Sequence, residues 1–250
     1  MAVQNFDRAH VQARKALTAF LCEALPHLHW SYNWPMPDAL AISGEASPYQ
    51  QTVLWKIETH RRWMKVSEPE RLNIAREVVI EWGGIKRITD SRLLEYVRNC
   101  SRRNPSLQLE GVSSYSKLLA VAAPDRYAIY DARVAVALNA IQHIWSKEPG
   151  IAFNYLPGRN RITGRSHPSK AGFSFDNRFL IKSLTNNGWQ PISQNETYSA
   201  YLGLLQSILP EFPDYRLHDL EMALFAEAER LALRAMYGRK DPVGRATSCS

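Results

Sequence analysis

Apolar side chains recur every three or four residues along much of this chain, with polar side chains between them. The pattern is clearest over residues 6–24, 134–145 and 217–235. In the first of these segments, Arg14 and Lys15 lie on the side opposite the apolar stripe. This spacing is typical of one face of an amphipathic α-helix, whereas the alternation that marks a strand is scarce. The pattern therefore predicts an all-α fold.

Two further helices are predicted from the residues at their ends. Ser67 and Glu70 form a capping box that opens a helix over residues 67–82, and the two glycines of residues 83–84 end it. A similar polar start predicts a helix over residues 90–98. We therefore expect one helix after another along the chain.

The chain has no internal repeat and no clear linker, so we expect one helical domain over residues 1–237, with a division into two lobes as an alternative. Residues 151–178 differ from the rest, because aromatic side chains there alternate with glycine, proline and cations. This segment predicts either a long loop or a short hairpin insertion. Residues 238–250 are polar and small, which predicts a flexible tail.

Composition narrows the class of protein. A content of 45% hydrophobic and 22% charged residues excludes a disordered chain, and no apolar run reaches the length of a membrane-spanning helix. Asp7 and Arg8 precede any apolar run, so we expect no secretory signal. Cys22, Cys100 and Cys249 are too few and too far apart for a disulfide framework or a zinc site. We expect a reducing bacterial cytosol and no cofactor.

The charge balance favours a polyanionic partner. Lysine and arginine number 31 against 24 acidic residues, which gives a net charge of +7 and a pI near 9.4. A positive field of this size attracts DNA and RNA, although a basic protein without such a ligand is the alternative.

The segment with the most specific chemistry is residues 109–138, LEGVSSYSKLLAVAAPDRYAIYDARVAVAL. Gly111 permits a sharp turn, and the serines after it can cap a short apolar helix that carries Lys117. The chain then runs extended through residues 127–130 and enters the next helix at Asp131. A carboxylate there accepts bonds from helix amides and is favoured by the helix dipole. A lysine and an aspartate are thus expected on neighbouring helix starts.

This segment resembles the helix-hairpin-helix DNA glycosylase superfamily, which includes endonuclease III, adenine glycosylase and 8-oxoguanine DNA glycosylase. Residues 109–113, Leu-Glu-Gly-Val-Ser, are similar to the family's hairpin, and Lys117 is similar to its catalytic lysine. Residues 129–134, Ile-Tyr-Asp-Ala-Arg-Val, are similar to the segment with the essential aspartate, Asp131. The likeness covers about 30 of 250 residues and is greatest to bacterial proteins of the 8-oxoguanine glycosylase fold.

The resemblance implies an all-α glycosylase fold and an enzyme that flips a damaged or modified base out of double-stranded DNA and excises it, with an oxidised purine favoured by analogy. It implies that Asp131 stabilises positive charge on the sugar and that Lys117 forms a Schiff base with abasic-site lyase activity. The residues implied to contact DNA near the site are Gly111, Val112, Ser113, Ser114 and Arg133. We expect a monomer without a membrane partner.

Three departures from the family pattern leave alternatives open. Ser113 stands where the family has a second glycine, and Lys117 precedes Asp131 by 14 residues, about one helical turn less than the family spacing. Lys117 also lies two residues further from the hairpin glycine, a shift that turns a side chain by about 200° round a helix. A surface cation is therefore the second interpretation of Lys117, and a plain helix cap is that of Asp131.

The irregular segment 151–178 offers a second set of candidate DNA contacts. Its cations suit phosphates and its aromatic rings suit an extruded base, while a solvated loop with a few buried aromatics is the alternative. The cations are Arg159, Arg161, Arg165 and Lys170, and the aromatic residues are Phe153, Tyr155, Phe173 and Phe175.

Aromatic residues elsewhere have simpler interpretations. Tyr32 and Trp34 lie in a proline-rich segment and are expected to pack beneath it. Trp82, just before the two glycines, is expected in the core. His27 and His29 lack a nearby cysteine or carboxylate pattern, so we expect no metal site.

Two other classes of protein remain as alternatives to the enzyme. One is a DNA-binding module without catalysis, for example in bacterial phage defence, and the other is an all-α protein-interaction domain with an incidental basic surface. Duplex binding that weakens with salt separates the last class from the other two. Base release that is lost in Asp131→Asn separates the enzyme from the DNA-binding module.

Overall fold

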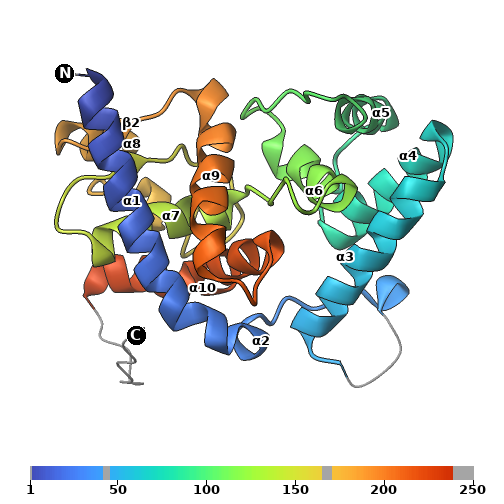
Figure 1. Cartoon of the computed structure of the whole chain (residues 1–250), viewed down its shortest axis with the longest axis horizontal. Helices are drawn as coiled ribbons and strands as arrows, with labels where there is room; N and C mark the ends of the chain where they lie inside the picture. Colours follow the sequence, from blue (N-terminus) through green and yellow to red (C-terminus); the bar gives the residue numbers. More distant parts are fainter. Residues whose placement is uncertain (1, 42–45, 165–170, 239–250) are drawn as a thin grey trace.

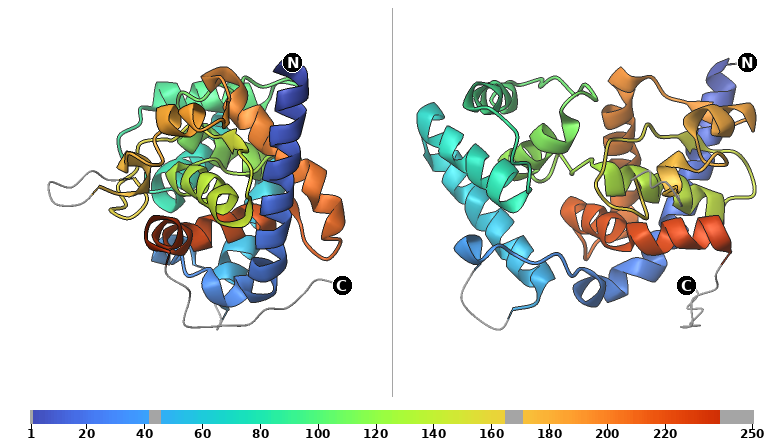
Figure 2. Two further views of the ribbon diagram at one scale, coloured as in Figure 1. Left: turned by 90° about the vertical axis from the view of Figure 1, so that its left-hand side faces the viewer. Right: turned by 180° about the vertical axis from the view of Figure 1, so that it is seen from behind.

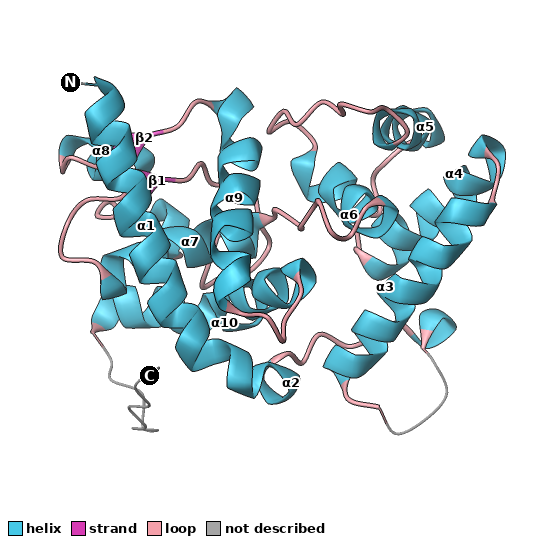
Figure 3. Cartoon of the chain, in the orientation of Figure 1, coloured by secondary structure: helices cyan, strands magenta, loops and turns pink. Residues whose placement is uncertain are grey.

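The computed structural model describes residues 2–41, 46–164 and 171–238. The protein is mostly helical, which confirms the predicted all-α class (Figure 3). A two-residue parallel pair, β1 (Ile151–Ala152) with β2 (Gln190–Pro191), is the sheet structure within the described ranges. None of the described helices combines the length and the apolar character that crossing a bilayer requires.

The helices form two lobes that face each other, seen from both sides in Figures 1 and 2. One lobe contains α1 (Ala2–Ala24), α7 (Ala132–Trp145), α8 (Ile181–Asn186), α9 (Gln194–Ile208) and α10 (Leu217–Tyr237). The other contains α3 (Pro48–Lys65), α4 (Glu68–Arg76), a π-helical turn (Glu77–Trp82), α5 (Asp90–Cys100) and α6 (Val112–Ala122). The short α2 (Leu28–Ser31) contacts both α10 and α3. Short 3-10 turns occur at Leu25–His27, Asp38–Leu40, Phe173–Phe175 and Leu209–Glu211.

Packing within each lobe follows the apolar stripes of its helices. In the first lobe, α7 packs against both α1 and α10, and in the second α6 packs against α3 and α5. One contiguous cluster of buried apolar residues extends through both lobes. The two lobes therefore share a core rather than forming separately packed units.

The predicted helix ends are mostly confirmed, with two corrections. The Ser67 amide donates to Glu70 Oε2 over 2.9 Å, as a capping box requires. The helix that follows changes from α to π geometry over Glu77–Trp82 before it ends at the glycines. Helix α5 begins at Asp90, as predicted, and Thr89 caps it, since the Thr89 hydroxyl accepts from the Arg92 amide over 3.3 Å. The helix continues to Cys100, two residues beyond the predicted end.

The described part of segment 151–178 is a loop, so the hairpin alternative is wrong for these residues. Its first two residues pair with Gln190–Pro191, far downstream, instead of with a neighbouring strand. Further on, the loop closes on itself, since the Phe173 amide donates to the Ile162 carbonyl over 2.8 Å. The tail predicted beyond residue 238 lies outside the described residues.

Candidate active site

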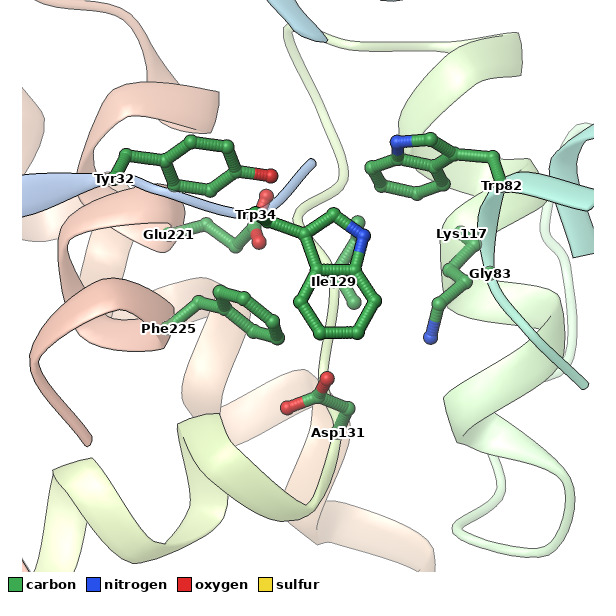
Figure 4. Close-up of a pocket in the computed structure, with 9 residues that line it drawn as sticks. All are labelled: Tyr32, Trp34, Trp82, Gly83, Lys117, Ile129, Asp131, Glu221 and Phe225. Atoms are coloured by element: carbon green, nitrogen blue, oxygen red, sulfur yellow. The ribbon is translucent and has the colours of Figure 1, made fainter. Parts of the chain in front are cut away.

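A pocket opens where the two lobes meet (Figure 4). The segment after α2 and helix α10 form one wall, the π-helical turn and α6 form the other, and the start of α7 lies between them. Its volume of about 70 Å³ is room for several water-sized groups, at about 10–15 Å³ each. The lining residues are Tyr32, Trp34, Trp82, Gly83, Lys117, Ile129, Asp131, Glu221 and Phe225.

Lys117 reaches this pocket from the middle of α6. The residue is only 8% exposed, and its Nζ donates to the Ser113 carbonyl over 2.6 Å. Figure 4 shows the amine directed into the pocket, toward the side where Asp131 lies. The interpretation of Lys117 as a surface cation is therefore wrong. The two-residue shift in the sequence pattern has not turned this side chain away from Asp131.

Burial changes the acid–base behaviour of the Lys117 amine. Loss of hydration lowers its pKa below the ordinary lysine value, and the Lys56 ammonium adds to this effect. Asp131 and Glu221 act in the opposite direction, because each carboxylate favours the charged amine. A lowered pKa increases the fraction of neutral amine at neutral pH, and the neutral amine is the nucleophilic form.

Asp131 both caps α7 and lines the pocket. Its Oδ1 accepts from the Arg133 amide over 2.9 Å and from the Val134 amide over 3.0 Å. Figure 4 shows the carboxylate pointing into the space opposite Lys117. Asp131 is thus a helix cap, which was its second interpretation from the sequence. The cap bonds also fix its carboxylate at the pocket.

The extended segment before Asp131 is held by side chains from two helices. The Tyr130 amide donates to Ser116 Oγ over 3.2 Å, and Ser116 immediately precedes Lys117. From α9, the Tyr198 hydroxyl donates to the Ala128 carbonyl over 2.8 Å and the Tyr201 hydroxyl donates to the Ile129 carbonyl over 3.0 Å. The Ser116 bond holds the segment that carries Asp131 against the helix that carries Lys117, and the two tyrosines hold it against α9.

Aromatic rings form much of the pocket wall. Trp34 and Phe225 meet edge to face with ring centroids 5.4 Å apart. On the other wall Trp82 stacks on Trp55 at 4.9 Å. Trp82 is buried as predicted, but the sequence pattern did not predict that Trp82 or Trp34 would border a pocket. Such walls suit a flat ring.

A buried ion pair completes the site, and neither of its partners was predicted from the sequence. Lys56 Nζ donates to Glu221 Oε2 over 3.1 Å, and the two side chains are 7% and 4% exposed. Burial raises the pKa of the Glu221 carboxyl, and the Lys56 ammonium opposes that rise. A signal was present, because Glu221 lies within the apolar stripe of α10 between Leu217 and Leu224.

The residues of segment 111–114 that were predicted to contact DNA divide into two groups. Val112 and Ser114 are buried, and their amides donate to the carbonyls of Leu109 and Gly111 over 3.1 and 2.9 Å. Neither is therefore available to a phosphate, and both are corrected as candidate DNA contacts. Gly111 and Ser113 remain partly exposed. Gly111 has φ +73°, and a Cβ there would collide with the Tyr96 hydroxyl, so this turn requires glycine.

Three of the arginines that were predicted to contact DNA lie near the start of α7. Arg133 donates to Glu229 Oε1, as does Asn160 Nδ2 over 2.7 Å, and the exposed Arg159 and Arg161 flank Asn160. The guanidinium carbon of Arg133 also lies 4.8 Å from the centroid of the Phe225 ring, which lines the pocket. The pocket itself is lined by aromatic and ionisable groups rather than by these arginines.

The other predicted contacts in segment 151–178 are not supported as stacking surfaces. Phe153 and Phe173 are fully buried, and the Tyr155 hydroxyl donates to the Phe179 carbonyl over 2.9 Å. Phe175, at 49% exposed, is the one of the four aromatic residues open to solvent. Arg165 and Lys170 lie outside the described residues.

Gly83 leaves the space that the Lys117 side chain occupies. A Cβ at Gly83 would lie 2.8 Å from both Lys117 Cδ and the Val79 carbonyl oxygen. Gly83→Ala is therefore expected to lower the free energy of unfolding by about 1–3 kcal/mol in urea denaturation. Gly203→Ala, at a helical position with no atom within 4 Å of the added Cβ, is the matched control. It should raise stability by about 0.5–1 kcal/mol, and equal effects at both positions would contradict the close contact.

Comparison of the chain with protein-family models, curated proteins and solved structures gave no match.

Proposed function

We propose that this protein is a helix-hairpin-helix-type DNA glycosylase that excises a damaged or modified base and then cleaves the abasic strand through Lys117. The observation that carries the proposal is the meeting of Lys117 and Asp131 in one aromatic pocket. An amine with a lowered pKa and a fixed carboxylate suit the two charged stages of this reaction.

The pocket accepts a nucleotide that has left the double helix. The C1′ atom of a stacked nucleotide is shielded by its neighbours, so an enzyme that acts there extrudes the nucleotide first. The aromatic walls offer ring faces that replace part of the lost base stacking. Arg159 and Arg161, exposed beside the start of α7, would bind the flanking phosphates.

In the first chemical stage the bond between C1′ and the base breaks, and its electron pair leaves with the base. Positive charge develops on the sugar, next to the carboxylate of Asp131. Because its cap bonds hold this carboxylate in place, little reorganisation is needed when the charge appears.

In the second stage the lone pair of Lys117 Nζ bonds to C1′. The C1′–O4′ bond then breaks, a proton passes from the nitrogen to O4′, and an iminium ion (Schiff base) links protein and sugar. Loss of a proton from C2′ expels the 3′ phosphate and cuts the strand. The attack on C1′ requires Lys117 to be the neutral amine, the form that burial favours.

Borohydride trapping tests both stages. Hydride reduces the iminium ion to a stable amine, so the wild-type protein should form a covalent adduct with duplexes that contain 8-oxoguanine or an abasic site. Lys117→Gln should abolish the adduct, whereas Lys182→Gln, at an exposed lysine of α8, should leave it unchanged.

The outcomes separate the parts of the proposal. Base release that is lost in Asp131→Asn, with no adduct from any duplex, would keep the glycosylase and remove the lyase step. If a panel of oxidised, alkylated and deaminated bases gives no adduct and no base release, the enzymatic function is overturned. A DNA-binding module is then favoured.

A further inference from the structure

Glu221 is the buried acidic group of the pocket that the proposed reaction does not use. Its residue is 3% exposed, yet it lines the pocket. Among the described residues its carboxyl receives one hydrogen bond, from Lys56 to Oε2. The second oxygen, Oε1, receives no hydrogen bond from another described residue, so it can accept one from a donor that enters the pocket.

The residues around Glu221 indicate which kind of group would donate a hydrogen bond to Oε1. Phe225 follows Glu221 by four residues on α10, so both project from one face of the helix. Figure 4 shows both side chains directed into the pocket, beside Trp34. A flat ring that stacks on the aromatic wall would therefore present an edge to the Glu221 carboxylate. Lys56, 3.1 Å away, favours the ionised form, which only accepts hydrogen bonds.

We propose that Glu221 selects the base by accepting two adjacent N–H groups from the edge of the heterocycle. This inference rests on the proposed function and specifies its substrate class. A guanine-type edge, with a ring N–H beside an exocyclic amino group, supplies such a pair of donors. Adenine and cytosine offer an amino group beside a ring lone pair, which a carboxylate repels, and thymine offers one N–H between two carbonyls.

The test compares two duplexes that differ in one donor. One carries 8-oxoguanine and the other 8-oxohypoxanthine, which lacks the exocyclic amino group. A 2′-fluorine on the target sugar disfavours positive charge there and prevents release, so equilibrium binding is measured directly. The wild-type protein should bind the 8-oxoguanine duplex at least tenfold more tightly, because one charge-assisted hydrogen bond is lost with the other base.

Variants then assign this preference to Glu221. In Glu221→Gln combined with Lys56→Met, which leaves no unpaired buried charge, the ratio of the two affinities should fall below about twofold. Glu221→Asp keeps the charge but withdraws the carboxylate, and it should also reduce the ratio if the double variant does not fold. Glu227→Gln, on the same helix and paired with Arg230, should retain the wild-type ratio.

A purely structural role for Glu221 gives a different result. The variants would then change the temperature of unfolding but leave the affinity ratio unaltered, and this outcome would overturn the proposal. Wild-type binding without discrimination would overturn it as well, even if trapping succeeds. Discrimination without excision or trapping would instead keep the role of Glu221 and remove the enzymatic function.

Discussion

Lys117→Met is expected to raise the stability of the protein at neutral pH and to abolish borohydride trapping. The lysine amine is buried, and burial lowers its pKa below that of the unfolded chain. Methionine has a similar length and no charge to desolvate, so the free energy of unfolding should rise by about 1–2 kcal/mol. Gain of stability with loss of chemistry is typical of a site whose reactive group is held in an unfavourable environment.

The pH dependence of this effect follows from proton binding. Since the folded state lowers the pKa of Lys117, the unfolded chain binds more protons between the lowered value and the ordinary value of 10.5. The wild-type protein therefore gains stability from this group as pH rises through that range. The advantage of Lys117→Met is full below the lowered pKa and disappears above the ordinary one.

Urea denaturation at several pH values measures this difference. Lys182→Met, at an exposed lysine, should change the free energy of unfolding by less than about 0.5 kcal/mol at every pH. If Lys117→Met instead destabilises the protein equally at all pH values, the lysine is a favourable part of the core and the argument for a neutral amine fails.

Lys56→Met is expected to cause the largest loss of stability, about 3–5 kcal/mol at neutral pH. The substitution leaves the Glu221 carboxylate buried without the ammonium that now lies 3.1 Å away. Adding Glu221→Gln should recover most of the loss, because the double variant buries no unpaired charge. Arg98→Ala breaks an ion pair whose side chains are 60% and 48% exposed, and it should cost less than about 1 kcal/mol.

The loss of stability caused by Lys56→Met should be smaller at acid pH. Burial already raises the pKa of Glu221, and removal of Lys56 removes a group that lowers it. The folded state of the variant then binds more protons than the unfolded chain, so its stability falls as pH rises above the ordinary glutamate value. Thermal unfolding of the variant and the wild type between acid and neutral pH measures the effect. If the variant is less stable than the wild type by the same amount at every pH, the loss comes from packing and not from an unpaired charge.

The sequence pattern was sufficient for several of the helices and for the position of Asp131 in the site. Apolar spacing located α1, α7 and α10, because each of them buries one stripe. Asp131 was identifiable because a helix cap is a local feature, set by the residues that adjoin it. The direction of the Lys117 side chain could not be read from local sequence. The spacing between Lys117 and the hairpin glycine differs from the family pattern, so the side of the helix on which the lysine lies was open.

The features that could be read from the sequence are therefore local: the helical class, several helix ends and a carboxylate at the start of α7. That Trp34, Trp82 and Glu221 meet Lys117 in one pocket followed from the tertiary structure. These residues come from four separate segments, and their contacts arise only when the two lobes close on a shared core. Periodicity reports which side of a helix is buried, but it carries no information on which distant side chain is buried against it.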